Sequence, residues 1–122
     1  HLKNTKRTIK DYDLILTGDL GKYGKQILVE YLKKQYNLDI SKIYNDCGTI
    51  VFDTKKQPVL AGGSGPVCSA LVNYSYIYKQ LKERKLKRVL LVPTGAIFSP
   101  TMLFQKESIP AIAHAISLEV VK

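Results

Sequence analysis

The segment that decides the fold reads DLILTGDLGKYG and covers residues 13–24. Its first five residues form a short apolar run that ends at Gly18, which is typical of a buried strand. A tight turn follows at residues 18–21, and apolar residues then recur at helical spacing over about residues 22–36. Asn37 is well suited to end this helix. The segment therefore predicts a strand, a turn and an amphipathic helix.

The rest of the chain continues this alternation. TIVF at residues 49–52 is rich in β-branched residues and predicts a second strand. A long helix is expected over about residues 66–85, a third strand at residues 88–92, and a last strand at residues 115–121 after a long loop, residues 93–110. The order β-α-β-α-β-loop-β predicts an α/β fold, with a mixed, mostly parallel sheet and helices on both faces.

Length and composition fit one globular domain or one half of a larger one, with 122 residues, 45% hydrophobic and 24% charged. This composition argues against disorder, and no apolar run approaches the length of a membrane span. We interpret residues 1–11 as a basic leader or linker and residues 12–122 as the domain. Cys47 and Cys68 are expected to be free thiols rather than a disulfide, because this is not the composition of a disulfide scaffold.

The formal net charge of +9 is unevenly distributed. Residues 1–10 hold four basic side chains and no acid, and residues 79–88 hold six against one acid, so these segments supply the whole excess. A solvated surface is the first interpretation, and nucleic acid is disfavoured because no aromatic residues form a stacking platform. Attraction to anionic lipid is the functional alternative, in which case neutralising Lys79, Lys82 and Lys85 should weaken binding to vesicles.

A glycine-rich turn precedes the long helix and is a candidate anion site. Gly62, Gly63, Ser64 and Gly65 could present backbone N–H groups to a carboxylate. An equally favoured interpretation is that small residues let a buried helix begin close to a strand. The spacing is not that of a dinucleotide fingerprint, and Pro66 stands where a nucleophile elbow has its last glycine. Ser64 is disfavoured as a nucleophile because no base is identifiable.

Two further features leave function and structure open. The segment TGAIFSPT at residues 94–101 follows a strand within an unusually long loop, and functional and structural interpretations are balanced there. His114 is the only internal histidine, and a structural role is favoured over that of a base or ligand. Together with Cys47 and Cys68 it does not have the spacing of a metal site.

Three segments carry a family resemblance. DLILTGDLGKYG, LAGGSGPVCSA and RVLLVPTGAIFSPTMLFQKESIPAIAHAISLE resemble, in this order, the C-terminal part of the stage V sporulation protein AD family, over residues 12–120. That family is similar in fold to thiolases and ketoacyl synthases, which pack two related halves into a five-layered sandwich. The resemblance implies that this chain is a thiolase-like second half, whose N-terminal half lies elsewhere.

The resemblance also implies a function. It suggests a protein that binds dipicolinic acid (pyridine-2,6-dicarboxylate), supporting its uptake into developing spores and its release at germination. Membrane channel proteins of the same operon are the expected partners, and the expected location is the periphery of the inner spore membrane, without a cofactor or nucleic acid. We expect one ligand carboxylate at the glycine-rich turn, with the opposite wall formed by Thr94, Gly95 and Ser99.

Catalysis is not expected, although the resemblance includes enzymes. Condensing enzymes of this kind take a histidine from the turn after the first strand of the second half, and a polar partner from the start of its buried helix. Here these places are residues 18–21, without histidine, and residues 62–65, without histidine or asparagine. One alternative is an acyl-thioester condensing enzyme whose nucleophile lies in the N-terminal half, and another is an anion-binding or scaffold domain with a different ligand. Without that half, the helix at residues 66–85 should expose an apolar face or pair into a homodimer.

Overall fold

The computed structural model describes residues 1–96, 99–109 and 111–121. Four strands form one sheet in the order β2-β1-β3-β4. β1 (Leu14–Thr17) lies parallel to both β2 (Tyr44–Asp46) and β3 (Arg88–Val92), whereas β4 (Ile116–Glu119) pairs antiparallel with β3. The predicted α/β class, with a mixed and mostly parallel sheet, is confirmed.

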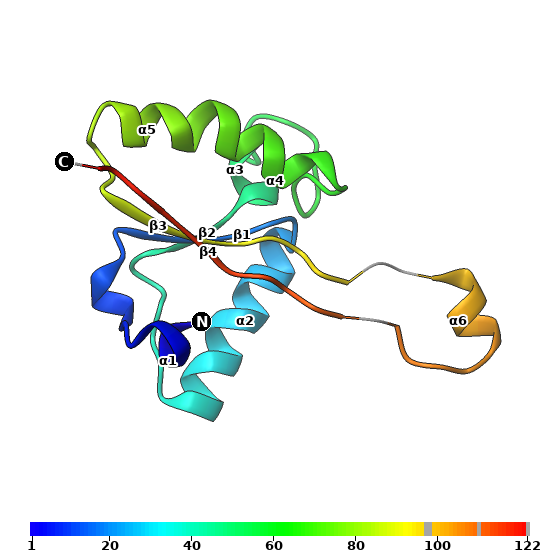
Figure 1. Ribbon diagram of the computed structural model, residues 1–122. Helices are drawn as coiled ribbons and strands as arrows, with labels where there is room; N and C mark the ends of the chain where they lie inside the picture. Colours follow the sequence, from blue (N-terminus) through cyan, green and yellow to red (C-terminus); the bar gives the residue numbers. More distant parts are fainter. Residues whose placement is uncertain (97–98, 110, 122) are drawn as a thin grey trace.

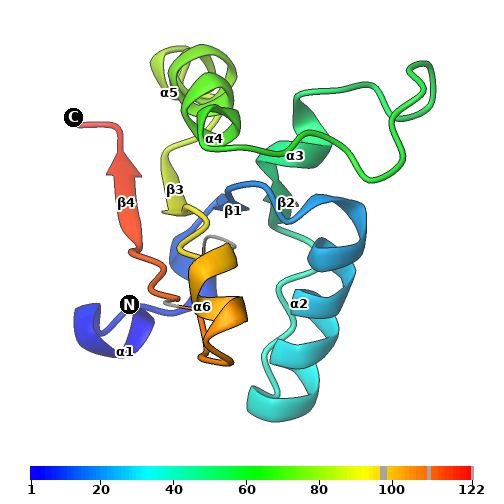
Figure 2. The same cartoon turned by 90° about the vertical axis from the view of Figure 1, so that its right-hand side faces the viewer.

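Helices cover both faces of this sheet, as expected (Figure 1). α2 (Gly21–Tyr36) lies on one face, and a continuous helix made of α4 (Val67–Val72), η2 (Asn73–Ile77) and α5 (Tyr78–Lys82) lies on the other (Figure 2). Successive strand side chains point to opposite faces and so build two cores. One contains Leu16, Val89 and Leu91, and the other contains Ile15 and Leu90.

Residues 1–11 are folded against the sheet. They contain α1 (Leu2–Thr5) and the short 3-10 helix η1 (Ile9–Asp11), and the side chains of Leu2 and Ile9 pack against the core on the α2 side. The guanidinium of Arg7 donates hydrogen bonds to Ser117 and Glu119 on the edge strand β4. The domain boundary at residue 12 stays a prediction.

The second strand lies earlier than expected. It is Tyr44–Asp46, and the TIVF segment instead begins in a short helix, α3 (Cys47–Ile50), so the strand predicted at residues 49–52 is wrong. The physical reason is the Asp46 carboxylate, which accepts the backbone N–H of Gly48 and begins a helical turn directly after the strand. Ile50, the last residue of α3, and Val51, which follows it, pack against the core.

The long helix buries a different face from the one that its periodicity suggested. A π-helical turn at η2 interrupts it, and its buried side chains include Cys68, Val72 and Ile77. Much of the expected stripe is exposed, namely Val67, Leu71, Tyr74 and Tyr78. Periodicity could not choose between the faces because both are apolar. An exposed apolar face is what we expected of an unpaired half, and self-pairing stays a prediction.

The chain between β3 and β4 forms an arm that projects from the body (Figure 1). Ala96 and Ala111 form an antiparallel bridge at its base, and the N–H of Ile112 donates to the carbonyl of Gly95 at 2.8 Å. The expected long loop contains a helix, α6 (Pro100–Phe104), at the end of this arm. Residues 97, 98 and 110 of the expected loop lie outside the described residues.

Candidate functional site

The carboxyl ends of the parallel strands are organised around Asp46, whose side chain is fully buried. Its two oxygens accept hydrogen bonds from Thr17 Oγ1 at 2.7 Å and from the backbone N–H groups of Leu20, Gly21 and Gly48 at 3.0, 2.9 and 3.0 Å. These four donors satisfy the carboxylate within the protein. Asp46 therefore joins the β1–α2 turn to the start of α3, and its role is structural.

A buried hydroxyl chain extends from this carboxylate. Thr17 Oγ1 lies 2.7 Å from the hydroxyl oxygen of Tyr44. Because the single hydroxyl proton of Thr17 is given to Asp46, the Tyr44 hydroxyl is the donor in this contact. Burial raises the pKa of Tyr44 to about 12, so the phenol keeps the proton that this hydrogen bond needs.

Asp19, in the turn after β1, brings the predicted site residues together. Its carboxylate accepts the N–H of Gly65 at 2.8 Å and the hydroxyl of Ser64 at 3.4 Å. Its own backbone N–H donates to Thr94 Oγ1 at 3.1 Å. The glycine-rich turn and the segment after β3 thus meet at Asp19, a residue that no sequence pattern indicated. The Gly65 N–H expected to bind a ligand carboxylate is held here by a carboxylate of the chain itself.

The other two glycines of the turn pack against α3. The N–H of Gly63 donates to the carbonyl of Gly48 at 2.7 Å. Gly62 has a φ of +108°, and a Cβ atom at this position would overlap the same Gly48 carbonyl. Close packing therefore accounts for Gly62 and Gly63, whereas Gly65 has the N–H geometry that an anion site requires.

An apolar cavity of about 300 Å³ lies beside Thr94. Its lining comes from the ends of β1 and β3, from α2 and the residue before it, and from both sides of the arm base, and it includes Leu20, Leu28, Val92, Thr94, Gly95 and Ile112. Gly95 is necessary here because a Cβ atom would overlap the Ile112 carbonyl across the arm. Ser99 lies apart from these residues, in the arm, where its side chain accepts the Met102 N–H at the start of α6.

Neither cysteine has the character of a nucleophile. Cys47 and Cys68 are free and buried, in agreement with the expected thiols. Burial raises the pKa of Cys47 to about 12 and also raises that of Cys68, so both are protonated at neutral pH. His114 is exposed. Within residues 1–96, 99–109 and 111–121, no group of His, Cys, Asp and Glu side chains is arranged to hold a metal ion. The helices formed by these residues are too short or too polar to span a membrane.

These features define a class of protein: an α/β domain whose polar turns converge at the carboxyl ends of parallel strands, where such sheets bind ligands. The family model for stage V sporulation protein AD matches residues 1–119. The chain is also similar to stage V sporulation protein AD of Bacillus subtilis (strain 168), with 51% identity over 119 residues. The chain belongs to the stage V sporulation protein AD family and is therefore part of a sporulation protein, with a spore-related location. The matched region covers 98% of this chain and 35% of that relative.

Proposed function

We propose that this chain is a non-catalytic binding domain for dipicolinic acid, in a protein that supports uptake of this acid into developing spores and its release at germination. The ligand class comes from the family resemblance. Its placement rests on one observation: Gly65 and Thr94 both form hydrogen bonds with Asp19, beside an apolar cavity. We place the site there, at the carboxyl edge of the sheet.

The chemistry of the ligand suits this edge. Dipicolinate has a flat aromatic ring, which the apolar walls of the cavity can cover, and two carboxylates, which need hydrogen-bond donors. The N–H of Gly65 and the hydroxyl of Ser64 are such donors, and both now face the Asp19 carboxylate. A ligand carboxylate must therefore displace Asp19 from them, so Asp19 is a competitor for the site.

Three observations support a role without catalysis. The β1–α2 turn contains Asp19 but no histidine, and the start of the long helix has neither histidine nor asparagine. The two thiols are buried and protonated at neutral pH. Turnover of malonyl or acetyl thioesters by the naturally encoded protein would contradict this part of the proposal and would favour a condensing enzyme.

We further propose that the exposed apolar face of the long helix receives the N-terminal half of the protein. A groove of about 750 Å³ runs beside this helix and is lined largely by apolar side chains, among them Leu14, Ile50, Val51, Leu71 and Leu86. The exposed side chains of Val67, Leu71, Tyr74 and Tyr78 gather on this helix, and an exposed apolar helix face is typical of an interface. A homodimer through the same face is the alternative, and light scattering during size-exclusion chromatography distinguishes the two. The proposed membrane partners are channel proteins of the same operon, at the inner spore membrane.

Calorimetric titration of dipicolinate into the naturally encoded protein tests the site. Ser64→Tyr should abolish binding by filling the space beside Gly65, whereas Ser108→Tyr, an exposed serine in the arm, should leave it unchanged. Asp19→Asn should raise the affinity, because it removes a competing negative charge. An unchanged affinity in Ser64→Tyr would overturn the placement, and no binding by the unaltered protein would overturn the proposal.

A further inference from the structure

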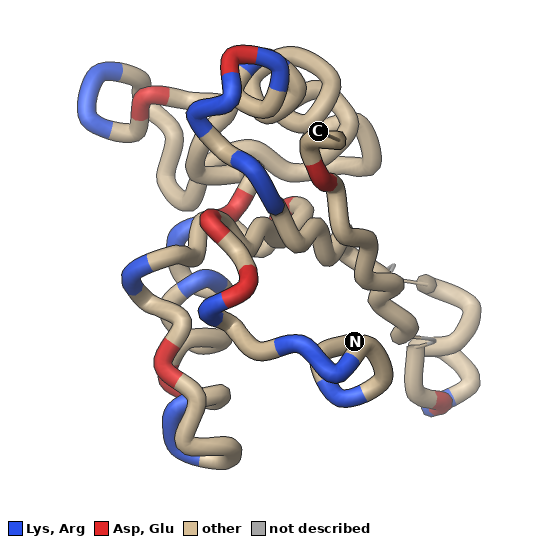
Figure 3. The backbone as a smooth tube through the Cα atoms, turned by 60° about the vertical axis from the view of Figure 1, so that its left-hand side comes forward, with Lys and Arg blue, Asp and Glu red and all other residues tan. Residues whose placement is uncertain are grey.

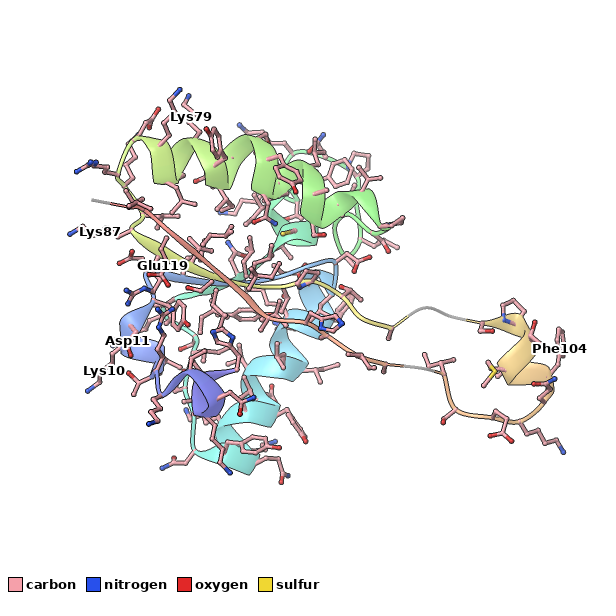
Figure 4. The ribbon with its side chains drawn as sticks, viewed as in Figure 1. Lys10, Asp11, Lys79, Lys87, Phe104 and Glu119 are labelled. Atoms are coloured by element: carbon pink, nitrogen blue, oxygen red, sulfur yellow. The ribbon has the colours of Figure 1, made fainter. Side chains whose placement is uncertain are left out.

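The two basic segments of the chain meet in one cleft. Lys10 comes from the N-terminal segment, and Arg84, Lys87 and Arg88 come from the turn between α5 and β3 and from the first residue of β3. The cleft has a volume of about 570 Å³ and lies at the amino ends of β1 and β3, opposite the Asp19 edge. Lys10 and Lys87 lie on the same side of the molecule (Figure 4), and Figure 3 shows basic residues along this side.

The acidic residues of this cleft are already engaged within the protein. The Asp13 carboxylate accepts the backbone N–H groups of Lys87 and Arg88 at 2.7 and 2.9 Å. Asp11 accepts the N–H of Thr8 at 2.7 Å. Glu119 accepts a hydrogen bond from Arg7, and its other oxygen lies 3.1 Å from Nε of Arg88. These contacts fix the three carboxylates in place, and the cleft keeps a small positive excess, with four basic side chains against three acidic ones.

Three cations of the cleft have no such engagement. In the described part of the chain, the side chains of Lys10, Arg84 and Lys87 have no acidic partner, and all three residues are exposed. Two of the three basic residues chosen from sequence differ in this respect, whereas Lys82 has no acidic partner in the described part of the chain either but does not line the cleft. Lys79 and Lys85 lie 3.9 and 2.7 Å from the Glu83 carboxylate, which offsets part of their charge.

We propose that this cleft is a docking site for the phosphate headgroups of an anionic membrane surface. Flexible lysine and arginine side chains without internal partners are suited to lipid phosphates. Val121 lies at the rim with 85% of its surface exposed, and an aliphatic side chain beside basic residues is suited to the headgroup boundary. Among the described residues, those that line the cleft include no aromatic side chain on which a base could stack, which disfavours nucleic acid.

Docking at this cleft leaves the opposite edge accessible. The cleft lies at the amino ends of the parallel strands, and the Asp19 turn lies at their carboxyl ends. A membrane bound at the first edge therefore does not cover the second. The proposal is independent of dipicolinate binding, which the titration above tests separately.

Co-sedimentation of the naturally encoded protein with vesicles tests the proposal. The probes are vesicles of phosphatidylcholine alone and vesicles that also contain phosphatidylglycerol. The triple variant Lys10→Glu, Arg84→Glu, Lys87→Glu should lose at least roughly a hundredfold in partition onto the anionic vesicles, since each basic residue near such a surface contributes about fivefold. The control Lys55→Glu, Lys56→Glu, Lys106→Glu makes the same change in net charge on exposed residues outside the cleft, and it should keep most of the binding.

Several outcomes would overturn the proposal. These are equal losses in the two triple variants, binding to neutral vesicles as strong as to anionic ones, and binding to RNA or an acidic peptide without binding to vesicles. High salt should release the protein from anionic vesicles, because screening shortens the range of the attraction. Val121→Asp should weaken vesicle binding further without changing the thermal unfolding midpoint, which separates membrane contact from a folding defect.

Discussion

Asp13 and Asp46 make the same kind of contact at opposite ends of β1, in very different surroundings. Each carboxylate accepts N–H groups from another part of the chain and so joins two elements of the fold. Asp46 is fully buried and has four donors, whereas Asp13 is exposed and has two. Water can replace a lost acceptor at the surface but not in the interior, so burial decides how much each contact contributes to stability.

The strongest test of this comparison is Asp46→Ala. It leaves the donors of Thr17, Leu20, Gly21 and Gly48 without their acceptor in a buried site. We expect the free energy of unfolding to fall by about 4 kcal/mol or more, measured by urea denaturation. Asp39→Ala, which removes an exposed carboxylate, should lower it by less than about 1 kcal/mol. Similar losses in the two variants would break the comparison.

A milder change tests the hydroxyl chain alone. Thr17→Val keeps the shape of the side chain but removes one donor of Asp46 and the acceptor of the Tyr44 hydroxyl. We expect a loss of about 1–3 kcal/mol in the free energy of unfolding, because both partners stay buried. Thr5→Val, at an exposed position in α1, is the matched control and should change it little. A loss no larger than that of the control would show that the hydrogen bonds of the Thr17 hydroxyl contribute nothing to stability.

For Asp13, at the exposed end of β1, the comparison predicts a small and pH-dependent contribution to the free energy of unfolding. The backbone N–H groups of Arg88 and Lys87 hold the pKa of Asp13 below its ordinary value of 3.8. Hydrogen bonds from Ser117 and Arg7 lower the pKa of Glu119 from 4.5 to about 2. Groups whose pKa is lowered by folding stabilise the folded state above their unfolded pKa, and this contribution is lost as the pH falls through the folded pKa.

Stability should therefore decrease as the pH falls from about 4.5 towards 2, as measured by urea midpoints in a pH series. Asp13→Asn should lower the free energy of unfolding at neutral pH by less than about 1 kcal/mol and make this decrease shallower. If stability falls as steeply with pH in Asp13→Asn as in the unaltered protein, Asp13 gives no pH-dependent stability.

The smallest change in stability is expected in the arm, because an exposed apolar side chain there makes little packing contact that a substitution could remove. Phe104, in α6, is 84% exposed (Figure 4). Phe104→Ser should change the free energy of unfolding by less than about 0.5 kcal/mol, measured by thermal unfolding. A loss above about 1 kcal/mol would mean that this side chain packs against the protein in solution.

Continuous apolar runs and helical spacing were sufficient to predict most of the fold. β1, α2 and β3 lie where these patterns placed them, because buried strands of a parallel sheet are apolar throughout. β2 was missed because two of its three residues, Asn45 and Asp46, are polar, and their hydrogen bonds are made only in the folded chain. The neighbouring TIVF segment therefore carried the stronger strand signal, although a capped helical turn begins there.

The candidate site was predictable in its loops but not in its central residue. Gly65 and Thr94 follow recognisable turn patterns, and they do lie close to one residue, Asp19. Asp19 itself looked like an ordinary turn residue, because its partners lie 46 and 75 residues further along the chain. Ser99 was grouped with Thr94 because the two are close in sequence, but Ser99 lies in the arm, at the start of α6.

The π-helical turn in the long helix has a consequence for insertions and deletions. The step between the buried side chains of Val72 and Ile77 is five residues, whereas an uninterrupted α-helix returns to the same face after about four. A chain shorter by one residue at this point could keep both side chains buried by forming an ordinary α-helical turn. Within this helix, η2 is thus the position where the length of the chain can change by one without shifting Cys68 or Leu81 out of the core.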